Sequence, residues 1–466
     1  MNILFASSEV APFAKTGGLA DVAGSLPKAL SSVGCNLRVI LPFYRCVKAL
    51  KLQVEPFKCG NFNFLRHRDN GVEYIFVVND NLYDRENLYS EPNGDYPDNY
   101  LRFSYYSKAI VELATKSDPE PDVINCNDWQ TGLVPLYLKI KKSRIKTLFS
   151  IHNIAYQGIF KKEILEEIDI PRDFYTTQGI EYYGKVCFLK AGLIYSTAIS
   201  TVSKKYGEEI LTKEFGCGMD GILRMRQSDL YGILNGVDYS KWDPEIDRFL
   251  ACNYNSETVQ KKTICKKDII EVVNLPAETI ERPLIGVISR LAEQKGIDLL
   301  VEAAGDIIKL GASMIILGTG DEKYNMLCRQ IGERFPKYIS SNVKFDNALA
   351  HKIEAGSDFF VMPSRYEPCG LNQLYSLRYG TLPVVRRTGG LDDTIIDLYE
   401  DTENGNGIKF EEATKKEMLE ALSRAIELMK DKASWQNILK RIMKIDFSWK
   451  RSALHYKELY RSLAGQ

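Results

Sequence analysis

Short runs of consecutive apolar residues, each followed by a longer helical pattern, constrain the fold of this chain most strongly. Residues 38–41 (Arg-Val-Ile-Leu) and 314–317 (Met-Ile-Ile-Leu) lack the alternation of polar and apolar residues that marks a strand with one solvated face. Unalternated strands are buried on both faces, as in parallel sheets that are covered by helices. The sequence therefore predicts an α/β protein built on doubly wound parallel sheets.

The expected strands fall into two groups. The first comprises residues 3–6, 37–41, 74–78, 123–126, 147–151 and 198–202, and the second comprises 284–288, 312–317, 358–362 and 382–385. Between them, residues 234–244 contain Asn-Gly and Asp-Pro pairs that signal turns. We therefore expect an N-terminal domain over 1–240 and a C-terminal domain over 241–445. Ligands of such folds bind at the carboxyl ends of strands, so the cleft between the two domains is the expected active site.

The last residues, 446–466, form a third expected segment. Apolar side chains recur there at helical spacing: Leu454, Tyr456, Leu459, Tyr460 and Leu463. This pattern predicts a terminal helix.

Composition excludes several functions. The 466 residues contain 61 Lys+Arg and 61 Asp+Glu, and this balance argues against a nucleic-acid or anionic-membrane binder. No stretch approaches the roughly 20 apolar residues of a membrane span. The ten cysteines form no C-x-x-C pair, which favours reduced thiols in the cytoplasm. The four histidines are isolated, so we expect no metal site.

A glycine pair follows the first expected strand, in residues 14–21 (Ala-Lys-Thr-Gly-Gly-Leu-Ala-Asp). Gly17 and Gly18 allow the backbone to approach a ligand closely, and the helix start behind them attracts an anion. Lys15 adds a full charge. The alternative is a surface turn with an exposed lysine.

Two loops of the second group of strands also carry candidates. Arg290 and Lys295 follow the strand 284–288, and two cations there suit a diphosphate. Glu367 lies in the loop 363–371, before an expected helix, where a carboxylate can receive sugar hydroxyls. The alternatives are a solvated basic pair for Arg290 and Lys295, and a helix-capping loop for the segment with Glu367.

A last group follows two strands of the first domain. Asp128 comes after residues 123–126, and His152 and Asn153 come after 147–151. We expect all three side chains to meet at one edge of the sheet. A lone histidine is more often structural than catalytic, but its place beside Asp and Asn favours a functional role.

Together these segments resemble the bacterial glycogen synthase and plant starch synthase family, retaining glucosyltransferases of the GT-B type. The resemblance extends over essentially the whole chain. The matching stretches are KTGGLADV (15–22), NDWQTGL (127–133), HNIAYQG (152–158), NGVD (235–238), SRLAEQKGIDLL (289–300), SRYEPCGLNQLYSLRYGTLPVVRRTGGLDDT (364–394) and FSW (447–449).

The resemblance implies transfer of glucose from a nucleotide-glucose, usually ADP-glucose, to the non-reducing 4-hydroxyl of an α-1,4-glucan such as glycogen. It implies two Rossmann-like domains that face each other across a cleft, with the acceptor on the N-terminal side and the nucleotide-sugar on the C-terminal side. It also implies that the terminal helix returns to the first domain. No cofactor and no metal are expected.

The resemblance assigns site residues as follows. The catalytic residues are His152, Glu367, Arg290 and Lys295. The donor-binding residues are Lys15, Gly17, Gly18, Asp128, Asn153, Phe345, Cys369, Gly370, Leu371 and Asn372, with Phe345 near the adenine where the family often has Tyr.

Retention is compatible with a double displacement or with a same-face attack. The residue eight positions after Glu367, a second glutamate in wider retaining GT-B enzymes, is Tyr375, so the resemblance does not support a two-glutamate mechanism.

Acceptor contacts are expected near the rim of the cleft. Glu9 and Asp21 are candidates, together with Tyr96 in the tyrosine-rich stretch 79–100, where rings can stack on sugar faces. Each could equally be half-buried structure.

Two rival functions use the same fold. A nicotinamide oxidoreductase would carry G-x-G-x-x-G after the first strand, with an acid about 20 residues later, and the sequence lacks this motif. A catalytically silent glucan-binding protein would not need the charged residues of both half-sites, which are all present.

Overall fold

The computed structural model describes residues 1–91 and 94–465, which form two compact units. Unit 1 comprises Met1–Gly236 and Trp449–Gln466, and unit 2 comprises Val237–Ser448. The chain therefore passes between the units twice. The two connecting segments are hydrogen-bonded to each other at the boundary of unit 2, where Val237 donates its backbone N–H to the carbonyl of Phe447 at 2.7 Å.

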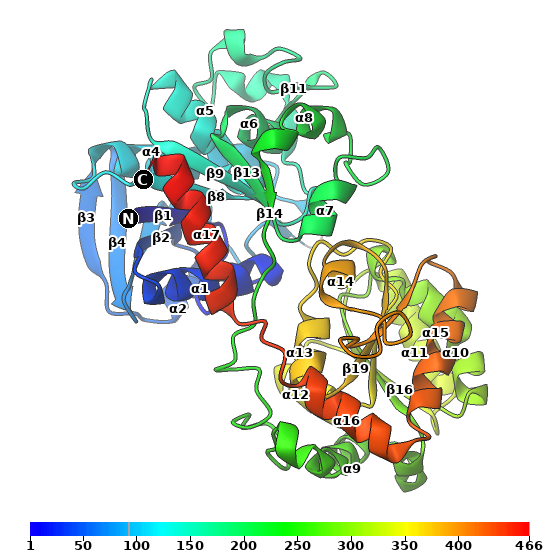
Figure 1. Ribbon diagram of the computed structural model, residues 1–466. Coiled ribbons are helices and arrows are strands. Elements are labelled where there is room, and N and C mark those ends of the chain that lie inside the picture. The colour runs from blue at the N-terminus through cyan, green and yellow to red at the C-terminus, as the bar shows by residue number, and fades with distance from the viewer. Residues whose placement is uncertain (92–93, 466) are drawn as a thin grey trace. The chain divides into compact units, whose positions relative to one another are not determined.

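Unit 1 is built on a nine-stranded sheet in the order β14-β13-β9-β8-β1-β2-β5-β4-β3 (Figure 1). Its strands are β1 (Asn2–Ala6), β2 (Asn36–Pro42), β3 (Glu55–Cys59), β4 (Phe62–Asp69), β5 (Val72–Val78), β8 (Val123–Asn127), β9 (Lys146–Ile151), β13 (Ala198–Thr201) and β14 (Leu230–Gly232). All neighbours are parallel except that β4 runs antiparallel to β3 and β5. The six strands expected in this unit are confirmed, but the sheet is mixed rather than purely parallel.

The described part of unit 1 also contains smaller ribbons and nine α-helices. The ribbons are β6 (Ser90–Glu91) with β7 (Gly94–Asp95), and β10 (Ile159–Lys161) with β12 (Lys185–Cys187) and β11 (Glu181–Tyr182). The helices are α1 (Gly18–Ser32), α2 (Arg45–Ala49), α3 (Asp80–Tyr83), α4 (Asn99–Lys116), α5 (Leu133–Ile140), α6 (Phe188–Tyr195), α7 (Lys204–Glu209), α8 (Asp220–Met225) and α17 (Trp449–Ala464).

The terminal helix α17 lies along α1 within unit 1 (Figure 1). Tyr460 is buried and its hydroxyl donates to Asn125 Oδ1 of β8 at 2.6 Å. Tyr456 and Leu459 are buried on the same side, whereas Leu454 is 46% exposed. The predicted apolar stripe is therefore correct except at Leu454, which lies on the outer face of the helix.

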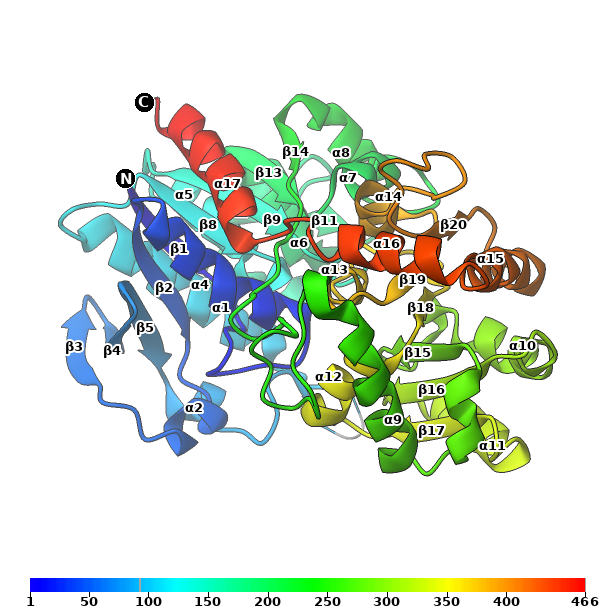
Figure 2. The same cartoon turned by 60° about the horizontal axis from the view of Figure 1, so that its bottom comes forward.

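Unit 2 is built on a six-stranded, wholly parallel sheet in the order β17-β16-β15-β18-β19-β20 (Figure 2). Its strands are β15 (Leu284–Ile288), β16 (Ser313–Gly318), β17 (Ile339–Val343), β18 (Phe359–Met362), β19 (Leu382–Arg386) and β20 (Ile408–Phe410). Its helices are α9 (Lys262–Val272), α10 (Ile297–Lys309), α11 (Glu322–Arg334), α12 (Asn347–Gly356), α13 (Asn372–Arg378), α14 (Gly389–Thr394), α15 (Lys415–Leu428) and α16 (Lys432–Ile442).

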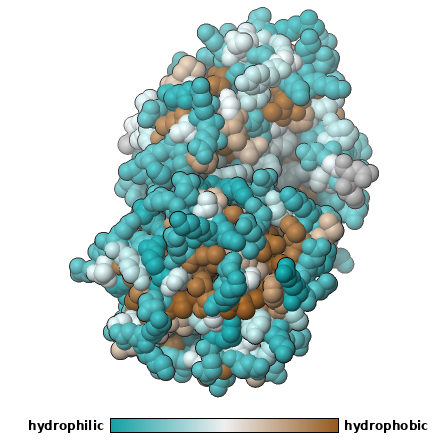
Figure 3. Space-filling model, turned by 90° about the vertical axis from the view of Figure 1, so that its right-hand side faces the viewer, coloured by the Kyte–Doolittle hydropathy of each residue, from teal (hydrophilic) through white to brown (hydrophobic). Residues whose placement is uncertain are grey.

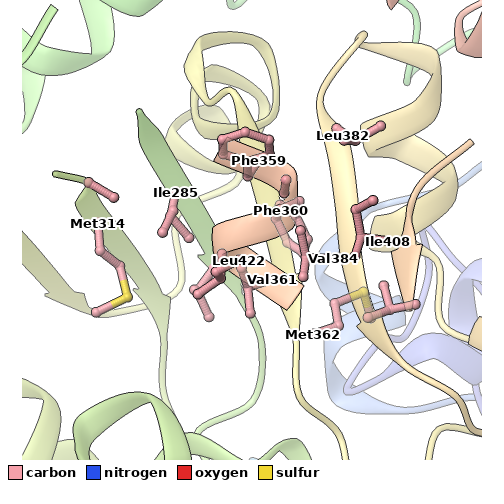
Figure 4. Packing of buried hydrophobic residues seen from close by; sticks show 14 of the residues in the cluster. Ile285, Met314, Phe359, Phe360, Val361, Met362, Leu382, Val384, Ile408 and Leu422 are labelled. Carbon is pink, nitrogen blue, oxygen red and sulfur yellow. The ribbon is translucent and has the colours of Figure 1, made fainter. Parts of the chain in front are cut away.

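Both faces of this sheet are apolar, as the unalternated runs predict. Ile285 and Met314 point into the cluster in Figure 4, which also contains residues of α10, α11 and α15. Leu284 and Ile315, the neighbours of these residues along each strand, belong to the opposite cluster with residues of α9 and α12. Burial on two faces is what requires apolar residues at consecutive positions.

Within the described residues, no helix is long and apolar enough to cross a membrane. On the face drawn in Figure 3, hydrophilic side chains surround smaller apolar patches.

Candidate active site

Each sheet has one point at which its strand order reverses, and ligands bind outside the carboxyl ends of the strands at such a point. In unit 1 this point is at β1, which pairs with β2 on one side and with β8 on the other. In unit 2 it lies between β15 and β18. The segments that leave these strands carry most of the residues singled out in the sequence.

The loop after β1, Lys15–Gly18, leads directly into α1 and is termed here the glycine loop. All four of its residues are exposed, and a Cβ added at Gly17 or Gly18 would meet no atom within 4 Å. Lys15 Nζ lies 2.7 Å from Asp21 Oδ1 in an exposed ion pair. Because the first turn of α1 leaves free N–H groups and a partial positive charge, this loop can accept an anion at close range.

Strands β8 and β9 end side by side and bring Asp128 and His152 together. Asp128 Oδ1 accepts the backbone N–H of His152 at 2.8 Å, and His152 Nε2 lies 2.9 Å from Asn127 Oδ1. Asn127 Nδ2 donates to the carbonyl of Ala6, so its oxygen is the atom that faces the imidazole. His152 Nε2 therefore carries the proton, and Nδ1 remains an acceptor.

Burial sets the charge of these two groups. It raises the pKa of Asp128 to about 7, to which the nearby charge of Glu9 contributes, and it lowers the pKa of His152 to about 4. The imidazole is thus neutral at pH 7, and Asp128 changes its charge near neutrality. Asp128 also has φ of 55°, a conformation that is strained for a residue other than glycine and that clusters at functional sites.

In unit 2, the loops after β15 and β18 are joined by an ion pair. Lys295 Nζ lies 2.5 Å from Glu367 Oε2, and Ser364 Oγ donates to the same oxygen at 3.0 Å. Glu367 is only 5% exposed. Gly296 permits this approach, because it has φ of 67° and a Cβ there would lie 2.2 Å from the carbonyl oxygen of Pro363.

The remaining candidates of unit 2 surround this pair. Arg290 is exposed, and its Nη2 donates to Gln294 Oε1 at 3.0 Å. Asn372 Nδ2 donates to the carbonyl of Ile288 at the end of β15 at 2.6 Å. Cys369 is buried, and Gly370 and Leu371 are half-buried in the turn before α13. In unit 1, Asn153 is half-buried next to His152.

Three predicted residues lie elsewhere or are covered. Phe345 is 80% exposed and follows β17 at the edge of the sheet. Tyr96 is 5% exposed, with guanidinium carbons at 4.7 Å (Arg85) and 4.9 Å (Arg102) from its ring. Glu9 is 4% exposed. Tyr96 and Glu9 are thus buried, and their contact with an acceptor stays a prediction.

The sequence did not reveal the residues that hold these groups in place. Asn127 fixes the tautomer of His152, Ser364 binds Glu367, and Tyr89 binds Glu9. Asn127 could have been found from its position next to Asp128 at the end of a strand. Nothing in the sequence indicates the roles of Tyr89 and Ser364. Tyr89 is far from Glu9 along the chain, and Ser364 lies with Glu367 in one loop.

Each unit gathers its own set of charged and polar groups. Unit 2 presents two cations and a buried carboxylate, and unit 1 presents a lysine, a helix N-terminus, a neutral imidazole and a carboxyl group. Within residues 1–91 and 94–465, no group of three His, Cys, Asp or Glu side chains could hold a metal ion. These groups suit an anionic ligand that also carries hydroxyls.

Comparison with known proteins agrees with this description. Residues 2–225 match the starch synthase catalytic domain, and residues 274–441 match glycosyl transferases group 1. A glycogen synthase of Koribacter versatilis is 44% identical over 99% of this chain and 98% of its own length. A glycogen synthase of Geotalea daltonii is 45% identical over the same shares.

This chain belongs to the glycogen and starch synthase family. It is therefore a glycosyltransferase, and neither the oxidoreductase nor the silent binding protein is favoured. The catalytic domain of starch synthase IV from Arabidopsis thaliana, bound to ADP and acarbose, is 32% identical and matches with a TM-score of 0.90 over 100% of this chain and 99% of that one. A sucrose-phosphate synthase from Thermosynechococcus elongatus, 16% identical, shares the fold with a TM-score of 0.62 over 100% of this chain and 99% of that one. The predicted GT-B fold and family are confirmed.

Proposed function

We propose that this chain is a glycogen synthase that transfers glucose from a nucleotide-glucose to the non-reducing 4-hydroxyl of an α-1,4-glucan, with retention of configuration. The observation that supports this best is the Lys295–Glu367 pair at the switch point of unit 2. It combines a cation suited to a departing phosphate with a buried carboxylate suited to a sugar. The full-length similarity to proteins named glycogen synthase points the same way.

Arg290 and Lys295 stabilise the leaving group in this proposal. The departing nucleoside diphosphate gains negative charge in the transition state, and cations already in place stabilise it without reorganisation. Arg290 can bind phosphate oxygens through two N–H groups, while Lys295 acts as a point charge. The diphosphate competes with Glu367 for Lys295. Lys15 and the N-terminus of α1 add positive charge from the acceptor-binding domain.

The reacting glucose contacts His152, Asp128, Asn153 and Glu367. The Nδ1 atom of neutral His152 accepts a hydrogen bond from a sugar hydroxyl. The carboxylates of Asp128 and Glu367 stabilise the positive charge that develops on an oxocarbenium-like sugar. Cys369, Gly370, Leu371 and Asn372 surround the glucose and its phosphates.

The reaction retains configuration through attack on the same face, with a donor phosphate oxygen as the acceptor of the proton. A second carboxylate nucleophile has no place eight residues after Glu367. Tyr375 occupies that position, and its ring stacks on Trp242 with centroids 4.0 Å apart.

ADP-glucose is the donor that we propose. The exposed ring of Phe345 offers a stacking surface for adenine, and the related starch synthase IV was solved with ADP. Glycogen is the proposed acceptor, with Asp21 among its contacts. We propose a cytoplasmic location, because all ten cysteines are free thiols, six of them buried.

Incubation of the purified protein with ADP-[14C]glucose and glycogen tests the function. We expect label in ethanol-precipitable polymer, a higher kcat/KM than with UDP- or GDP-glucose, and no change with EDTA, since Arg290 and Lys295 provide the positive charge. Binding of ADP-glucose without transfer would contradict the proposal.

A further inference from the structure

A buried carboxylate, that of Glu9, binds the backbone of the glycine loop. Glu9, three residues after β1, accepts hydrogen bonds from the backbone N–H of Thr16 at 2.5 Å and of Gly17 at 3.1 Å. It also accepts from the hydroxyls of Thr16 at 2.7 Å and Tyr89 at 2.8 Å. Four donors thus converge on the two oxygens of one side chain that is 4% exposed.

This carboxylate restrains a segment whose glycines lack packing contacts. Gly17 and Gly18 have no Cβ, and the space where one would lie is empty within 4 Å, so packing does not fix their backbone. Two N–H groups bound to Glu9 replace that packing. Hydrogen bonds to an ionised acceptor are about twice as strong as neutral ones.

A second loop of this chain has the same sequence but different contacts at its second glycine. The run Thr-Gly-Gly-Leu recurs at Thr388–Leu391 in unit 2. There, a Cβ at Gly390 would lie 2.1 Å from the carbonyl oxygen of Cys369, and the backbone N–H of Gly390 donates to the carbonyl of Glu367. Backbone contacts thus restrain Gly390 in the second loop, whereas at Gly17 a side-chain carboxylate accepts the backbone N–H.

Tyr89 extends the same network to the tyrosine-rich segment. Its hydroxyl lies 2.8 Å from both Glu9 Oε1 and Ser8 Oγ, and its carbonyl accepts from Asn99 Nδ2 and from the backbone N–H of Tyr96. Burial and the charge of Glu9 raise the pKa of Tyr89 well above its usual value, so it remains a donor.

We propose that Glu9 is a positioning residue for the sugar donor: its carboxylate holds the glycine loop in the conformation that receives the nucleotide-glucose. The inference rests on the proposed function for the identity of that donor. It replaces direct acceptor contact as the main role of Glu9.

Two variants test this role, with one control. Glu9→Gln keeps the size of the side chain but turns an NH2 group toward the converging donors. Tyr89→Phe removes one donor and leaves the carboxylate. Asp397→Asn is the matched control, because Asp397 is also buried and accepts two backbone N–H groups, from Tyr399 and Lys409, in the other unit.

We expect Glu9→Gln to raise the KM for ADP-glucose about tenfold, the scale of one charge-assisted hydrogen bond, and to leave the KM for glycogen within about twofold. Tyr89→Phe raises the donor KM by about twofold to threefold, which keeps the test valid if Glu9→Gln fails to fold. Asp397→Asn lowers the melting temperature and leaves both KM values unchanged. Hydrogen exchange of the unliganded protein becomes faster at the amides of Thr16 and Gly17 in Glu9→Gln only.

A Glu9→Gln variant with a raised KM for glycogen and an unchanged donor KM would overturn the proposal in favour of direct acceptor contact. Unchanged KM values with a lower melting temperature would leave Glu9 a purely structural role. If the unaltered protein transfers glucose from no nucleotide-glucose, the proposed function fails, while the exchange rates still decide whether Glu9 holds the loop.

Discussion

Replacing Lys295 by methionine separates the structural from the catalytic consequences of the ion pair. The lysine ammonium lies 2.5 Å from Glu367, whose side chain is 6% exposed, whereas the lysine side chain is 19% exposed. Breaking a buried pair costs about 3–5 kcal/mol when one charge stays buried. Because water reaches the lysine side, we expect Lys295→Met to lower the free energy of unfolding by about 2–3 kcal/mol. For a unit of this size, that is a fall in melting temperature of roughly 5–10 °C.

Turnover falls far more than this loss of stability explains. Removal of one preorganised charge costs about 10²–10³-fold in kcat, and Arg290→Ala has an effect of the same size. The double variant Lys295→Met with Glu367→Gln regains most of the stability, since a neutral amide needs no counterion, but it does not regain turnover. Urea unfolding and the radiochemical assay at 25 °C measure the two quantities.

Lys266→Met is the matched control. Lys266 forms a similarly buried pair with Asp358 at 2.7 Å, before β18 and therefore at the amino edge of the same sheet. It should lower stability by a comparable amount without changing kcat. If Lys295→Met kept its turnover within tenfold while folded, or if Lys266→Met lost as much activity, the account of leaving-group stabilisation would be refuted.

Three further predictions concern other residues. Glu367→Ala and His152→Ala should lower kcat far more than they weaken ADP binding in calorimetry, because the proposed function has both side chains contact glucose; the reverse pattern would contradict their proposed roles. Because Asp128 has a pKa raised to about 7 by burial, kcat/KM should rise with pH through about 7. The Asp128 carboxyl stays protonated up to a higher pH in the native state than in the unfolded state. The free energy of unfolding should therefore decrease as the pH rises from about 4 to about 7. Asp128→Asn should flatten both profiles, and unchanged profiles would exclude Asp128. Lys262→Met should cost about 3 kcal/mol in urea unfolding without lowering kcat, because the three N–H groups of the buried Lys262 ammonium lie within hydrogen-bond distance of three carbonyls and a hydroxyl; a loss below about 0.5 kcal/mol would contradict this.

The central strands could be predicted because burial on two faces leaves a visible apolar run. The edge strands could not. β17 reads Ile-Ser-Ser-Asn-Val and β3 reads Glu-Pro-Phe-Lys-Cys, since strands at an edge tolerate polar side chains and proline. Helix α1 also continues through Pro27, although a proline inside a helix removes one backbone hydrogen bond.

The location of the site could be predicted in part for a similar reason. Glu367 and His152 follow strands, and the carboxyl ends of parallel strands meet at one edge. The burial of Glu9 and Tyr96 could not be predicted, because loops have no periodicity to show which side chains point inward. Glu9 is buried where the chain returns with Thr16 and Tyr89 to bind it.

The linkage in the polymer product tests the central claim most directly. After incubation with ADP-[14C]glucose and glycogen, the labelled polymer is digested with β-amylase, which removes maltose from non-reducing ends joined by α-1,4 bonds. We predict that nearly all label is released as [14C]maltose, because glucose is added to those ends with its configuration retained. Label that resists β-amylase, or appears as free glucose only, would contradict the account.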